Sequence, residues 1–207
     1  QVAGIVRKRS AASVLRAALS IGWGGGDMTA GQAQGFSPIA RVFHWLTAAL
    51  ALTTLTIGIT MVNVPNLGPA GDMLFHLHRS IGILVLLVVA FRLIYRLRHP
   101  APPLPANMPA WQQYAAHATH WALYALLIVQ PILGWIATSA YRAPVLFFWI
   151  FELPPIWKED RPFSEALFGV HMSLGILIVA MICVHITAAL YHHFVLKDRV
   201  LKGMVSG

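Results

Sequence analysis

The chain has 207 residues, of which 57% are hydrophobic and only 11% are charged. A soluble domain carries about 25% charged residues, so the composition excludes an ordinary soluble protein and indicates an integral membrane protein. The net charge of +8 does not indicate nucleic acid, because the lysines and arginines gather beside apolar stretches, where a positive charge bias sets orientation in a membrane. We therefore predict a lipid bilayer as partner and no nucleic acid.

Four apolar stretches are each long enough to cross a bilayer, for which about 20 helical residues suffice. They cover residues 38–62, 75–97, 111–140 and 165–194. The third is interrupted by Pro131, which transmembrane helices tolerate better than soluble ones. The loop over residues 141–165 is aromatic and broken by prolines, and Trp149 and Trp157 favour the headgroup zone, so we predict an interfacial segment there. The expected fold class is all-α: a four-helix transmembrane bundle with up-down topology.

Residues 37–204 are expected to form one domain, and residues 1–36 a poorly ordered extension before it. The extension, the 98–110 connector and the C-terminal tail are all basic, whereas the 63–75 loop has no Lys or Arg. Because basic loops stay on the cytoplasmic side, we predict that both chain termini face the cytoplasm.

Four histidines fall at two depths in these spans. His171 and His185 are fourteen positions apart, which is about 21 Å along a helix, and they leave it on nearly the same face. With the predicted orientation, His78 lies near the outer side with His171, and His44 lies near the inner side with His185. Two histidines from different helices at one depth are what a six-coordinate haem b requires, so we predict two stacked haems.

The remaining sequence around these histidines bears on how a haem would be held. Cys183 is the single cysteine, which excludes covalent attachment through a CxxCH motif, so each protohaem would be bound without covalent bonds. Gly82 follows His78 by four residues, and Gly175 follows His171 by four. Each glycine would leave a flat patch for a macrocycle on the histidine's face, although small residues also serve ordinary helix packing in lipid.

Several other histidines remain alternatives at this point. His76 could replace His78 as a ligand, but not join it, because it lies about 200° round the helix. His117 and His120 begin the third span and could replace a ligand on the inner side. His99 precedes Pro100 and is expected to be a solvated connector residue.

Three motifs together resemble the bacterial cytochrome b561 family. They are RVFHW at 41–45, HRSIG at 78–82, and two histidines fourteen apart in a segment that ends in HHFVLKD. Over residues 36–204 the chain is similar to small four-helix di-haem members that carry electrons from superoxide to ubiquinone. The resemblance implies a bacterial inner-membrane protein whose two b haems have His44, His78, His171 and His185 as axial ligands.

The resemblance also implies a superoxide oxidase type of oxidoreductase, with superoxide as donor outside and ubiquinone as acceptor. A basic outer mouth would raise the local concentration of a small anion. Candidates for that mouth are Arg79, Arg142 and Lys158, although lipid headgroups could equally occupy these cations. Candidates for quinone contact or proton donation, since histidine titrates near neutral pH, are His192, His193 and Lys197.

Two other functions remain open. A cytochrome of this kind can also be the membrane anchor that links a hydrogenase or another periplasmic redox protein to the quinone pool. A histidine-bearing transporter is disfavoured, because the midplane parts of the second and fourth spans are smoothly aliphatic, whereas transporter sites use broken helices there.

Overall fold

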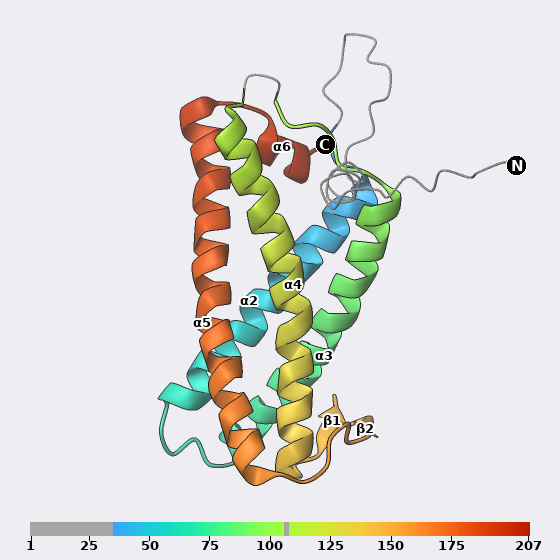
Figure 1. Ribbon diagram of the computed structural model, residues 1–207, viewed down its shortest axis with the longest axis vertical. Helices are drawn as coiled ribbons and strands as arrows, with labels where there is room; N and C mark the ends of the chain where they lie inside the picture. The colour runs from blue at the N-terminus through green and yellow to red at the C-terminus, as the bar shows by residue number, and fades with distance from the viewer. Residues whose placement is uncertain (1–34, 106–107) are drawn as a thin grey trace, which may run out of the picture.

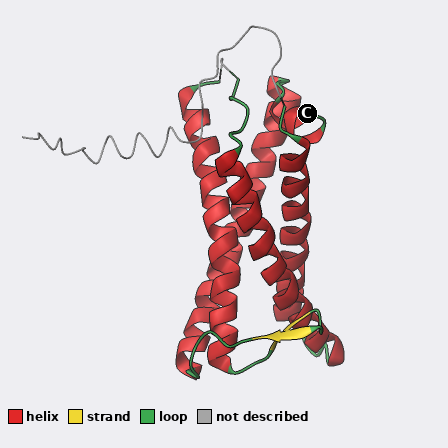
Figure 2. Cartoon of the chain, turned by 90° about the vertical axis from the view of Figure 1, so that its right-hand side faces the viewer, coloured by secondary structure: helices red, strands yellow, loops and turns green. Residues whose placement is uncertain are grey.

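The computed structural model describes residues 35–105 and 108–207, so the expected extension over residues 1–36 lies almost wholly outside the described residues. Four long helices run side by side along the long axis of the molecule (Figures 1 and 2). They are α2 (Pro38–Asn63), α3 (Pro69–Arg98), α4 (Ala110–Tyr141) and α5 (Arg161–Tyr191). All four are long and apolar enough to cross a membrane. The predicted four-helix transmembrane bundle is confirmed.

The two ends of the bundle carry different small elements. Strands β1 (Val145–Phe147) and β2 (Phe151–Leu153) lie at one end, called the hairpin end here, and the short helix α6 (Val200–Val205) lies at the other, the α6 end (Figure 1). Phe36 N–H donates to the Gly203 carbonyl at 3.1 Å. The first and last described residues therefore lie together at the α6 end, as four spans require.

Two helix boundaries and one interruption differ from the sequence prediction. Helix α3 begins at Pro69, six residues before the predicted start, because proline suits the first helical turn and Asp72 in that turn complements the helix dipole. Helix α5 begins at Arg161, where the Asp160 side chain accepts the Phe163 N–H at 3.1 Å. Pro131 does not interrupt α4, which continues through it.

The segment predicted only as interfacial contains an antiparallel hairpin, in which Val145 pairs with Leu153. Its turn has positive φ angles at Phe148 and Trp149. The hydroxyl of Ser80 on α3, which is fully buried, accepts the Phe148 N–H at 2.9 Å. That bond fixes the hairpin to the helix that also carries His78.

The α6 end is closed by the last residues of the chain. A π-helical turn, η1 (His192–Leu196), ends α5, and α6 folds back onto the start of α2. There Trp45 Nε1–H donates to the Met204 carbonyl at 3.1 Å, and the Arg41 guanidinium donates to the Val205 carbonyl at 3.2 Å. The tail is thus hydrogen-bonded to the first transmembrane helix.

Candidate functional site

The structure brings the four intramembrane histidines together as two pairs. The ring centres of His78 and His171 are 6.1 Å apart at the hairpin end, and those of His44 and His185 are 6.1 Å apart toward the α6 end. A metal–imidazole bond is about 2 Å long, so two imidazoles on opposite sides of one iron have ring centres roughly 6 Å apart. Both pairs therefore fit the separation that a bis-histidine haem needs.

The hairpin-end pair is held by reciprocal hydrogen bonds. His78 Nδ1–H donates to the Thr54 carbonyl of α2 at 3.0 Å, and His171 Nδ1–H donates to the Gln130 carbonyl of α4 at 3.1 Å. In return, Thr54 Oγ1 lies 3.4 Å from the His78 carbonyl, and the Gln130 amide donates to the His171 carbonyl at 2.7 Å. Because a carbonyl can only accept, the proton lies on Nδ1 and leaves Nε2 with the lone pair that a metal takes.

Two glycines allow these rings to dock. A Cβ atom on Gly58 would lie 3.0 Å from His78 Cε1, and one on Gly134 would lie 3.1 Å from His171 Cε1. Contacts that short force the neighbouring ring to move. Each glycine lies four residues after the residue whose carbonyl accepts from the histidine, which is Thr54 for Gly58 and Gln130 for Gly134. It therefore lies one turn along the same face of the helix. Neither glycine is predicted from the sequence, because both lie on the opposite helices and not next to the histidines along the chain.

The glycines that the sequence singled out lie elsewhere. No described atom lies within 4 Å of a Cβ built on Gly82, beyond its chain neighbours and its own helix backbone, and the nearest atom to one on Gly175 is Gln130 Nε2 at 3.4 Å. Neither glycine contacts an imidazole, so their role beside a macrocycle stays a prediction.

The pair toward the α6 end has different surroundings. The Arg92 guanidinium on α3 donates to His44 Nδ1 at 3.0 Å. Because Nδ1 accepts here, the neutral His44 ring carries its proton on Nε2, and Arg92 must leave Nδ1 before Nε2 can bind a metal. His120 on α4 also lies close, with its ring centre 5.4 Å from that of His185. His120 therefore remains an alternative ligand on this side. However, the distance between the His44 and His185 ring centres equals that of the hairpin-end pair, whereas the distance between His120 and His185 is shorter.

Other histidines are engaged outside the two pairs. The ring of His76 lies 5.9 Å from that of Trp149 in the hairpin turn, and His99 stacks on Tyr95 at 4.1 Å. His76 thus packs on the hairpin, while His78, two residues on, faces His171. This arrangement favours His78 over His76 as a ligand.

The candidates for quinone contact lie where α5 ends. His192 Nδ1 lies 2.5 Å from Asp198 Oδ2, and both side chains are mostly buried, with 12% and 20% exposed. Asp198 Oδ1 also accepts the Val200 N–H at 3.0 Å, which fixes the carboxylate at the start of α6. His193 Nδ1 is buried without a hydrogen-bond partner among the described residues, and Lys197 is exposed with a φ of 52°.

Asp198 is a site residue that sequence reasoning missed. It lies six positions after His192, a spacing that would not place two side chains together on an α-helix. The π-helical turn and the left-handed Lys197 bring them together.

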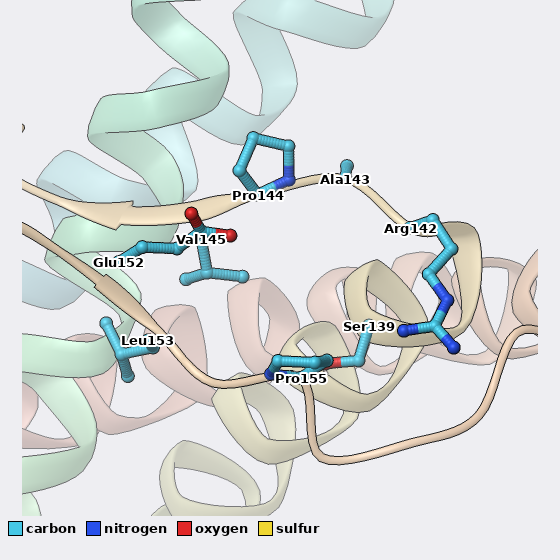
Figure 3. Close-up of a pocket in the computed structure, with 8 residues that line it drawn as sticks. All are labelled: Ser139, Arg142, Ala143, Pro144, Val145, Glu152, Leu153 and Pro155. Carbon is cyan, nitrogen blue, oxygen red and sulfur yellow. The ribbon is translucent and has the colours of Figure 1, made fainter.

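The candidates for an anion-attracting mouth surround the hairpin end. Arg142 lines a cavity of about 170 Å³ with Glu152 at its other side (Figure 3). Arg142 Nε lies 3.6 Å from Glu159 Oε2, and the Arg79 guanidinium donates to the Pro144 carbonyl at 3.0 Å. Lys158 is exposed outside that cavity. The charges at this end are mixed, so it is not a uniformly basic mouth.

A four-helix membrane bundle with facing imidazoles at two depths has the architecture of a b-type membrane cytochrome. The chain belongs to the prokaryotic cytochrome b561 family, whose model matches residues 35–207.

Three curated relatives cover most of the chain. Cytochrome b561 homolog 2 of Escherichia coli is 32% identical over 171 residues, which are 82% of this chain and 90% of that protein. A probable superoxide oxidase CybB of Yersinia pestis is 29% identical over 78% of this chain and 90% of its own length. Cytochrome b562 of Cereibacter sphaeroides is 27% identical over 84% of this chain and 97% of its own length. The protein is therefore a multi-pass membrane electron carrier of a family that binds haem b.

Proposed function

We propose that this cytochrome holds two b haems, oxidises superoxide at the periplasmic side of the bacterial inner membrane and reduces ubiquinone. The observation that carries the proposal is the two imidazole pairs, each with ring centres 6.1 Å apart. His78 and His171 would hold one iron, and His44 and His185 the other. A relative named a probable superoxide oxidase supports the choice of donor.

The proposed orientation rests on where the basic residues lie. The α6 end carries Arg96 and Arg98 at the end of α3, Lys197 and Arg199 between η1 and α6, and Lys202 in α6. The 64–68 loop at the hairpin end has no Lys or Arg, and the hairpin segment mixes both signs of charge. Cytoplasmic loops are the basic ones, so the α6 end would face the cytoplasm and the hairpin end the periplasm.

The roles of the side chains follow from this arrangement. When bound, haem supplies one-electron chemistry at its iron. Two superoxide anions give up two electrons and become two O₂, and one quinone takes two electrons and two protons. Arg142 and Arg79 would attract the anion at the hairpin end. His192, the first residue of η1 and seven residues past His185, would donate protons to the quinone from Nε2, with Asp198 accepting the Nδ1 proton.

Rapid mixing of the purified, oxidised protein with superoxide tests the proposal. We expect the haem absorption to shift to the reduced form on mixing, and to return when ubiquinone is added. A matched mixture with superoxide dismutase should show no reduction. If superoxide does not reduce the haems but a co-purifying periplasmic redox protein does, the result would favour the membrane-anchor function.

Replacing Asp198 by asparagine tests how protons reach the quinone. Asparagine keeps an oxygen for the Val200 N–H but no longer accepts strongly from His192, so the imidazole loses its orientation. We expect oxidation of the reduced haems by ubiquinone to slow about tenfold to a hundredfold, with reduction by superoxide and haem content unchanged. Stopped-flow absorbance measures both half-reactions.

Two controls accompany this variant. Asp198→Glu should recover part of the rate, and Asp72→Asn at the other end of the bundle should leave both half-reactions at the wild-type rate. Equal slowing of the two half-reactions by Asp198→Asn would show a general structural defect and refute the proton role.

A further inference from the structure

Each transmembrane helix carries two chemically distinctive residues fourteen positions apart. The pairs are His44 and Gly58 on α2, His78 and Arg92 on α3, His120 and Gly134 on α4, and His171 and His185 on α5. Fourteen residues are close to four turns, so both members of each pair lie on nearly one face of their helix. Arg92 is thus to α3 what the candidate ligand His185 is to α5.

These positions form two levels of unlike chemistry. The hairpin-end level consists of two histidines, each against a glycine of the neighbouring helix: His78 with Gly58 and His171 with Gly134. At the other level, Arg92 donates to His44 at 3.0 Å, and His120 lies 5.4 Å from His185. The level toward the α6 end therefore contains a permanent cation, Arg92. The corresponding residue on α5 is His185.

The bundle offers Arg92 no carboxylate. The seven acidic residues of the chain are Asp27, Asp72, Glu152, Glu159, Asp160, Glu165 and Asp198. None lies in α2 or α4, and the one in α3 is twenty residues before Arg92, at the hairpin end. Among the described residues, Asp198 is the single acid at the α6 end, and it is bonded to His192. A cation inside a membrane protein is costly unless an anion or other polar group compensates it.

We propose that Arg92 binds a propionate carboxylate of the haem held by His44 and His185. The inference rests on the proposed function, since it needs a haem at that level. Haem b carries two carboxylates, and a planar guanidinium matches a carboxylate with two parallel hydrogen bonds. The guanidinium donates to His44 Nδ1, and its Cζ lies 5.2 Å from the ring centre of Tyr124 on α4. Arg92 thus lies between side chains of α2 and α4. With a haem bound, His44 would need its proton on Nδ1, so the guanidinium would turn from His44 to the propionate.

A propionate held by Arg92 would also set the order of the two reduction potentials. A positive charge near an iron favours the reduced state, which carries one positive charge fewer. The hairpin-end level has no such cation among its four positions, and Arg79 beside it is turned to the Pro144 carbonyl. The haem near Arg92 is therefore the one on which electrons should settle, next to the His192–Asp198 pair.

Redox potentiometry of Arg92→Gln and Arg92→Lys tests the inference. In Arg92→Gln we expect the haem held by His44 and His185 to have a lower midpoint potential, or to be lost so that the chain holds about one haem. The haem held by His78 and His171 should keep its potential. Arg92→Lys retains the charge and should stay close to wild type. Arg98→Gln, a change at an exposed residue six positions further along α3, is the matched control.

Porphyrin chemistry separates a propionate contact from a general effect of charge. Full-length protein made in haem-deficient membranes is supplied with protohaem or with its dimethyl ester. In wild type, the ester should bind the site of His44 and His185 about tenfold more weakly than protohaem does. In Arg92→Gln, the two porphyrins should bind that site equally well. Equal binding of both porphyrins by wild type, or unchanged potentials in Arg92→Gln with two haems bound, would overturn the inference and leave the proposed function standing. Wild-type protein with fewer than two haems would instead refute the proposed function.

Discussion

Replacing either His78 or His171 with alanine is expected to remove one whole haem and leave the other. The same holds for His44 or His185 with the second haem, because each haem would keep only one of the two imidazoles proposed to hold it and would be bound too weakly to persist. Pyridine haemochrome quantitation should give two protohaems per chain in the wild type and one in each single variant. Reduced-minus-oxidised spectra should show which centre remains.

Double variants and neighbouring histidines make this prediction specific. His78→Ala with His171→Ala should match each single variant, whereas His78→Ala with His44→Ala should lose both haems. His120→Ala should keep two haems, even though its ring lies 5.4 Å from His185. If His120→Ala loses a haem and His44→Ala does not, His120 and not His44 is the partner of His185.

Valine at Gly58 or Gly134 is expected to empty the hairpin-end haem site from the opposite helix. A Cβ atom alone would lie 3.0 Å or 3.1 Å from Cε1 of the facing histidine, and the two further carbons of valine occupy the space that the ring uses. The ring would be pushed away from its carbonyl partner, Thr54 or Gln130. We expect about one haem per chain, with the spectrum of the centre near His44 unchanged.

Smaller and distant substitutions calibrate that result. Alanine at Gly58 needs a ring shift of only a few tenths of an ångström, so it should retain most of the haem and alter its spectrum slightly. Gly169→Val is a control, because no described atom of another element lies within 4 Å of a Cβ at that position. Two intact haems in Gly134→Val would show that the close approach of His171 is not required.

The pairing of the histidines followed from the sequence, because two rules fix it. Helical rise sets the depth of each residue, and the charge of the loops sets the direction of each helix. Together they put His78 level with His171 and His44 level with His185 before any side chain is placed. The predicted start of α3 is wrong because proline and glycine are typical of loops, whereas here Pro69 begins the helix.

The residues that surround the pairs were harder to predict. Gly58 and Gly134 lie against histidines of neighbouring helices, and the hydrophobic pattern of a helix does not predict how it is rotated relative to its neighbour. Asp198 meets His192 only through a π-helical turn, which a regular helical period does not anticipate. The hairpin has strands of three residues each, too short for an alternating pattern to emerge.

The hydrogen bond between Ser80 and the hairpin limits how the loop can be exchanged. Grafting a shorter loop from another cytochrome would remove the Phe148 amide and leave a fully buried hydroxyl with one partner fewer. The hydroxyl would keep its hydrogen bond to the His76 carbonyl at 2.8 Å, so the loss is one hydrogen bond, about 0.5–1.5 kcal/mol, two residues from His78. A chimaera should therefore be more stable when Ser80 is replaced together with the loop.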